Sequence, residues 1–250
     1  MEKRFLSSSS SLLHSHHRKS IQPNRALSGP GPGPTSIDEL RVCTNRTCMK
    51  QGSIQTLQNL TDLAPPNVVV KRCGCLGRCG SGPNVAVLPP GIIVGHCGTA
   101  SQAAQLVCGP GGGDMWKTTL EALGLRKRAE GEIGMGRFDQ AQLLLSQAID
   151  LQPYGGIHNL YRLSSSTRLA MGDNVGALED ARTALKLSPN YVEAHMSEGD
   201  ALMAMGQYDG AESSYAYCLQ IDPSIRRSKN FKTRVKNLQE KLAAATTSHD

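Results

Sequence analysis

A repeat in the second half of the chain sets the tightest limit on its fold. Prolines recur at intervals of 36 and 34 residues, at Pro153, Pro189 and Pro223. Small side chains recur with the same period, at Ala141, Ala177 and Ala211, and again seven residues later at Ala148, Ala184 and Cys218. Units this short cannot bury a hydrophobic face alone, so they stack and share a core. The pattern therefore predicts an all-α solenoid.

Each unit also carries a turn signal ahead of its first small residue. Gly136, Gly172 and Gly206 each follow a methionine and precede the alanine at the close helix contact. Together with the closing proline, this arrangement resembles the tetratricopeptide repeat (TPR). The resemblance implies three repeats over residues 116–223, about the smallest number that buries a continuous core. Residues 224–250 are then expected to form a basic capping helix and tail.

The first 37 residues differ in composition from the rest. They are rich in serine, carry five Lys or Arg against the single acid Glu2, and contain no apolar stretch long enough for a secretory signal. We interpret residues 1–37 as a chloroplast transit peptide, with a mitochondrial one or an ordinary disordered tail as alternatives. This segment holds most of the net charge of +6, so bulk charge does not predict nucleic-acid binding. No apolar run predicts a transmembrane span.

Two segments rich in glycine and proline enclose a region with a different pattern. Segments 29–34 and 109–113 are typical of linkers. Strand patterns between them lie at 39–42, 67–72, 84–88 and 92–94, and helix patterns at 48–63 and 100–107. The order predicts a compact α/β domain over residues 38–108. A flexible linker at 109–115 is expected to let this domain and the repeats behave as separate units.

Four cysteines in this region form two close pairs. Cys43 and Cys48 follow the first strand pattern, and Cys75 and Cys79 follow the second. Thiolates are soft ligands that suit iron–sulfur clusters and zinc. The spacing alone leaves a [2Fe–2S] cluster, structural zinc and free thiols open.

The stretch around the second pair adds a resemblance. Residues 72–85 contain glycines between and after the cysteines and a Gly-Pro that follows them. Together with the first pair, this resembles the thioredoxin-like [2Fe–2S] ferredoxins. The resemblance implies a thioredoxin-like fold and a [2Fe–2S] cluster held by Cys43, Cys48, Cys75 and Cys79, with zinc as the alternative metal.

The repeats are expected to bind a protein partner in a concave groove. Chaperone-binding repeat domains clamp a C-terminal carboxylate with Lys, Asn, Asn, Lys and Arg. The corresponding positions here are Arg126, Glu130, Leu163, Glu193 and Ser197. Because these side chains do not reproduce that set, we expect no carboxylate clamp for Hsp70 or Hsp90. Residues 226–241 carry seven Lys or Arg against Glu240, which suggests an acidic protein or an anionic membrane surface as a further partner.

These features predict a plastid adaptor without catalytic activity. In the first hypothesis, an iron–sulfur cluster transfers single electrons or senses redox state while the repeats choose the partner. In the alternative, the chain is an assembly factor or scaffold for a chloroplast complex, such as a photosystem, and its metal site is structural.

Overall fold

The computed structural model describes residues 37–109 and 111–247. The predicted transit peptide, apart from Ile37, lies outside the described residues. No helix within the described part of the chain is long and apolar enough to cross a membrane.

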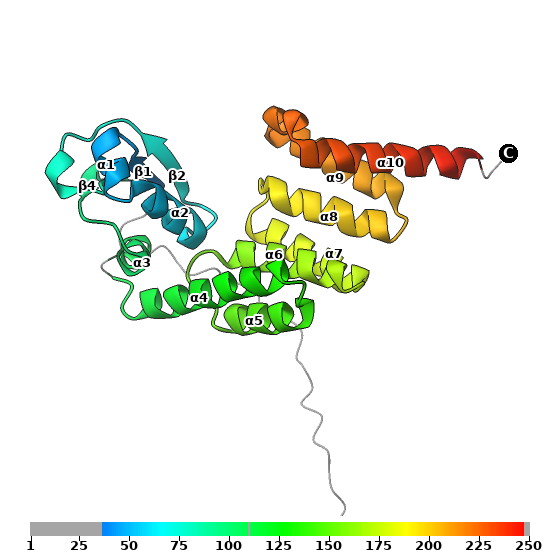
Figure 1. Ribbon diagram of the computed structural model, residues 1–250, viewed down its shortest axis with the longest axis horizontal. Helices are drawn as coiled ribbons and strands as arrows, with labels where there is room; N and C mark the ends of the chain where they lie inside the picture. The colour runs from blue at the N-terminus through cyan, green and yellow to red at the C-terminus, as the bar shows by residue number, and fades with distance from the viewer. Residues whose placement is uncertain (1–36, 110, 248–250) are drawn as a thin grey trace, which may run out of the picture. The chain divides into compact units, whose positions relative to one another are not determined.

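A four-stranded sheet with three flanking helices forms the first region (Figure 1). The elements in chain order are β1 (Glu39–Cys43), α1 (Arg46–Lys50), α2 (Ser53–Leu63), β2 (Val69–Cys73), the 3₁₀ turn η1 (Cys79–Ser81), β3 (Val85–Leu88), β4 (Ile92–Val94) and α3 (Ala100–Cys108).

The strands lie in the order β2-β1-β3-β4. Strand β1 pairs parallel with β2, with Leu40 opposite Val70, and antiparallel with β3, with Leu40 opposite Val87. Strands β3 and β4 form an antiparallel hairpin. The predicted order of strands and helices is thus present, and the thioredoxin-like assignment stays a prediction.

The helix predicted over residues 48–63 is divided in two. Gly52 adopts φ +93°, a left-handed conformation that interrupts the helical hydrogen bonding between α1 and α2. The division leaves Cys48 in the short helix α1 and Leu60 and Leu63 in α2. Leu40 and Val42 of β1 are buried against these leucines, so the central strand lies inside the core of this region.

Six antiparallel helices follow, in three pairs, and are capped by a seventh. They are α4 (Met115–Gly134), α5 (Phe138–Asp150), α6 (Ile157–Ala170), α7 (Asn174–Leu187), α8 (Val192–Ala204), α9 (Tyr208–Ile221), the 3₁₀ turn η2 (Pro223–Arg227) and α10 (Lys229–Thr247). The mostly helical solenoid confirms this part of the predicted fold.

The recurring small residues lie where the paired helices meet. All six of the alanine and cysteine positions in the repeat pattern are completely buried. Gly136, Gly172 and Gly206 adopt positive φ angles of 74°, 84° and 74° between the helices of each pair. Only glycine adopts this conformation without strain from a Cβ atom, so each one ends the first helix and lets the chain reverse.

The sheet region and the first repeat share a hydrophobic core, contrary to the separate units expected from the linker. Leu123 of α4 is buried in the same cluster as Leu60 and Leu63 of α2, and Trp116 packs against that cluster. The loop before α6 also contacts α2 closely. A Cβ atom on Gly155 would lie 1.9 Å from the backbone oxygen of Leu63.

Candidate functional site

The first cysteine pair spans the end of β1 and helix α1, and the second pair follows β2 at the same end of the sheet. Cys43 ends β1 and Cys48 lies in α1, and both are buried. Cys75 and Cys79 are exposed, with their Sγ atoms 3.6 Å apart. The backbone N–H of Gly77 donates a hydrogen bond to the Cys75 sulfur over 3.4 Å.

Hydrogen bonds and charge connect the two pairs. Burial opposes ionisation of Cys43, but N–H groups of Asn45 and Leu76 hold the pKa of that thiol below its ordinary value. Leu76 lies between Cys75 and Cys79, in the segment that follows β2. The pKa of Cys79 is raised, first by its hydrogen bond with Cys75 and then by the negative charge of that thiolate. The structure therefore brings the four predicted residues near one another as an exposed pair and a buried pair.

This arrangement overturns the predicted cofactor. Within residues 37–109 and 111–247, no group of three or more Cys, His, Asp or Glu side chains is positioned to hold a metal ion. A [2Fe–2S] cluster or tetrahedral zinc needs ligands that converge on one centre. The predicted [2Fe–2S] cluster and the alternative zinc ion are therefore both wrong. The importance of Cys43, Cys48, Cys75 and Cys79 as a functional set stays a prediction.

Two other cysteines are packing residues. Burial raises the pKa of Cys97 to about 11 and that of Cys218 to about 12. Cys218 lies completely buried at a helix crossing in the repeats. Both thiols are therefore protonated at neutral pH and shielded from reagents.

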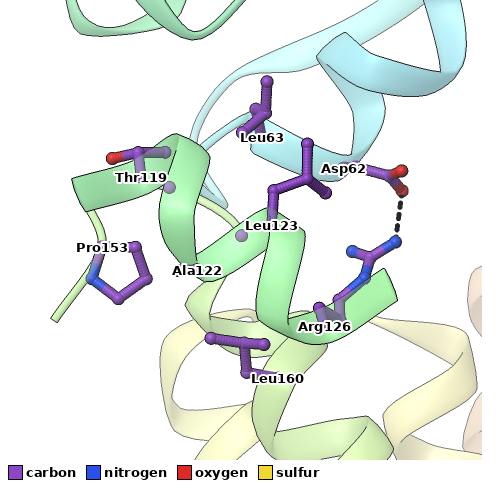
Figure 2. Close-up of a pocket in the computed structure, with 10 residues that line it drawn as sticks. Asp62, Leu63, Thr119, Ala122, Leu123, Arg126, Pro153 and Leu160 are labelled. Carbon is purple, nitrogen blue, oxygen red and sulfur yellow. Dashed lines mark ion pairs between the residues drawn. The ribbon is translucent and has the colours of Figure 1, made fainter. Parts of the chain in front are cut away.

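In the repeats, the predicted partner site begins at Arg126 of α4. Its Nη2 atom lies 2.7 Å from Oδ1 of Asp62 in α2 (Figure 2). Its Nε atom lies 3.1 Å from Oε1 of Glu130. The Asp62 and Arg126 side chains are 7% and 10% exposed. Gln58 also donates a hydrogen bond to Asp62 Oδ1 over 3.0 Å. A buried ion pair with these additional contacts holds α2 against α4.

The other four positions compared with the clamp lie on three helices. Glu130 pairs with Arg126, and Leu163 is buried in a hydrophobic cluster of the first two repeats. Glu193 is exposed, and the Ser197 hydroxyl donates to its backbone oxygen over 3.1 Å.

A cluster that the sequence reasoning missed lies between α6 and α8. The rings of His158 and Tyr191 meet edge to face with centroids 5.2 Å apart, and the Tyr191 hydroxyl donates to Asn159 Oδ1 over 2.6 Å. The positive charge of Arg162 also acts on the Tyr191 side chain. His158 and Arg162 are four residues apart, which places them on one face of α6. The four-residue spacing is the sequence signal that could have identified His158 and Arg162 as neighbours.

The capping helix is attached by a strong ion pair. Arg234 of α10 contacts both carboxylate oxygens of Asp200 in α8, with distances from 2.7 to 2.9 Å. The Tyr215 hydroxyl donates to the same carboxylate over 2.7 Å. Arg234, one member of the predicted basic surface, therefore stabilises the end of the solenoid.

Comparisons with known proteins agree with the helical pairs. A family model described as tetratricopeptide repeat matches residues 168–223, within the three predicted repeats. The chain carries tetratricopeptide repeats.

Two curated relatives belong to larger proteins. "Protein STIP1 homolog" of Dictyostelium discoideum is 36% identical over 87 residues, which is 35% of this chain and 15% of the relative. "Heat shock protein STI1" of Saccharomyces cerevisiae is 28% identical over 103 residues, 41% of this chain and 17% of the relative. The chain thus spans less than a fifth of the length of these two relatives.

Solved repeat domains are also similar. The first TPR domain of human RPAP3 has a TM-score of 0.47 and 21% identity, covering 51% of this chain and 97% of that domain. The first TPR of Spaghetti (RPAP3), solved with the HSP90 peptide SRMEEVD, has a TM-score of 0.44 and 21% identity, covering 49% and 94%.

The predicted exclusion of Hsp70 and Hsp90 as partners is wrong. The matched relatives include "Heat shock protein STI1" of Saccharomyces cerevisiae. The exclusion rested on five positions compared with a single clamp pattern. Since other donors along a groove can also hold an acidic tail, the absence of that pattern excludes no chaperone.

Proposed function

We propose that this protein is a non-catalytic adaptor of the co-chaperone type, which binds an acidic peptide segment of its partner through the tetratricopeptide repeats. The match of the repeat family to residues 168–223 carries the proposal. Stacked repeats of this kind present an extended surface for binding another chain. The sequence similarity to "Heat shock protein STI1" supports a partner of the chaperone class.

Titration of a fluorescent peptide with the full-length chain tests this function. The peptide SRMEEVD, found with a similar domain, is a suitable probe. We expect saturable binding that weakens as salt concentration rises, because acidic side chains contribute to recognition. Absence of saturable binding to this peptide and to the HSP70 peptide SGPTIEEVD would rule out the chaperone-type adaptor.

We also propose that residues 1–37 direct this adaptor to the chloroplast, where it acts as a scaffold for a larger complex. The serine-rich, acid-poor composition of that segment supports the proposal. A reporter fused to residues 1–37 is expected to enter plastids, and a cytosolic signal would refute the assignment. Electron transfer is not carried forward, because it requires the cluster.

A further inference from the structure

The geometry points to a carboxylate-binding site in the repeats, formed by Arg162 with His158 and Tyr191. This inference rests on the proposed function and names the side chains that recognise the acidic partner. The three residues come from α6 and from the residue that precedes α8. All three are half-buried, so a ligand can reach them while their orientation stays restricted.

Arg162 is a cation without an acidic partner. It takes part in no ion pair with the side chains that the structure describes, whereas Arg126, Arg168 and Arg234 all do. Its Nε atom is buried and has no hydrogen-bond partner in the described part of the chain, and the same holds for the Nδ1 atom of His158. Buried polar groups in folded proteins are normally hydrogen-bonded. Because protein encloses both of these atoms, an incoming ligand would meet the outer N–H groups of the Arg162 guanidinium.

The charges around the cluster explain why the incoming group should be negative. Burial, together with the positive charges of Arg126 and Arg162, lowers the pKa of the His158 imidazole to about 4. The histidine is therefore neutral and contributes no charge at neutral pH. Asp62 and Glu130 pair with Arg126, and Glu193 is the acid that acts on Tyr191. Arg162 therefore keeps its positive charge, and none of these acids forms an ion pair with it.

The shape of the cluster favours a carboxylate. A guanidinium group is planar and presents parallel N–H donors that match the two oxygens of a carboxylate. The Tyr191 hydroxyl already donates to Asn159 over 2.6 Å, so its oxygen is free to accept from Arg162. Tyr191 is thus a positioning residue that orients the guanidinium, and Asn159 fixes the tyrosine.

Peptide titrations with the full-length chain test the site. The probes are SRMEEVD and a version in which every carboxylate is replaced by an amide. We expect Arg162→Gln to weaken binding of the acidic peptide about tenfold or more, because a charged hydrogen bond is lost. Arg128→Gln is the matched control, because Arg128 is exposed and forms no ion pair within the part of the chain that the structure describes. It removes the same charge and should change the affinity less than about twofold.

Arg162→Lys separates charge from geometry. It keeps the charge and loses the planar donors, so its affinity should lie between that of the wild type and Arg162→Gln. Circular dichroism checks that each variant is folded. Acidic peptide that binds Arg162→Gln as tightly as the wild type would overturn the site while leaving the adaptor function standing.

A second readout does not depend on the chosen peptide sequence. The Nε–H NMR signal of Arg162, assigned by its loss in Arg162→Gln, should shift when an acetylated tripeptide of aspartates is added. The corresponding tripeptide of asparagines should leave it unchanged. An unshifted signal with both tripeptides would refute the carboxylate site. A shifted signal together with no binding of either chaperone peptide would retain the site and reject the chaperone-type partner.

Discussion

The sheet region and the repeats bury their cores in different ways. In the sheet region, pairing between distant strands places Leu40 of β1 opposite Val70 and Val87. Leu60 of α2 packs in the same hydrophobic cluster. In the repeats, Ala177 and Ala211 are completely buried at equivalent helix crossings. A repeated local rule builds the solenoid, whereas contacts between distant segments build the sheet. The two meet at α4, where Leu123 contributes to the core of the sheet region.

The strongest test of this junction is the substitution Asp62→Ala. It leaves the buried Arg126 without its closest carboxylate and is expected to lower the free energy of unfolding by about 3–5 kcal/mol. Urea denaturation followed by circular dichroism measures the change. Glu130→Ala is the control within the same network, because Glu130 is 42% exposed and should cost less than about 1 kcal/mol. Equal effects of the two variants would show that α2 and α4 are not held by the buried pair.

A pair of glycine substitutions sharpens the same comparison. Gly155→Ala brings a Cβ atom within 1.9 Å of the Leu63 oxygen, so the loop or α2 must move, at an expected cost of about 1–3 kcal/mol. Gly124→Ala is the matched control, since a Cβ there meets nothing within 4 Å. Within α4, alanine should stabilise the helix by about 0.5–1 kcal/mol. Thermal denaturation measures both changes, and a neutral Gly155→Ala would argue against the close approach.

The repeat core is tested by Ala177→Leu. The larger leucine side chain must fit into a completely buried contact between helices. The resulting overpacking is expected to lower the free energy of unfolding by about 1–3 kcal/mol. The fluorescence of Trp116, which packs on the sheet-region core, should report a separate change if the two regions unfold independently. A single transition by both fluorescence and circular dichroism supports the shared core.

Thiol labelling compares the two regions without changing stability. Cys75 and Cys79 are exposed, whereas Cys218 is buried with a pKa raised to about 12. We expect iodoacetamide to modify Cys75 and Cys79 first and Cys218 last, as measured by peptide mass spectrometry over time. Labelling of Cys218 as fast as Cys75 would contradict the packing of the repeats.

The repeats could be predicted from the sequence because their pattern is local. Gly136, Gly172 and Gly206 marked the turns between helices, and the structure places each one at a positive φ angle. The break at Gly52 was missed, because an isolated glycine in a helical pattern does not reveal whether its φ angle is positive. The order of the strands along the chain could also be predicted, because each strand pattern is itself local.

The junction and the candidate binding site depended on contacts that no local pattern encodes. The composition of segment 109–113 predicted a flexible linker, but the Asp62–Arg126 pair joins residues 64 positions apart in the chain. The cysteine spacing suggested one metal centre, whereas the thiols form two pairs. Arg162 and His158 share a face of α6 by their spacing, but Tyr191 joins them only through the packing of α8.

Hydrogen–deuterium exchange of the full-length chain, with and without the SRMEEVD peptide, tests the central claim most directly. The account predicts added protection in the repeats, centred on α6 and the start of α8, with little change in the sheet of residues 39–94. Protection confined to the sheet region, or none at saturating peptide, would contradict the conclusion that the repeats recognise the partner.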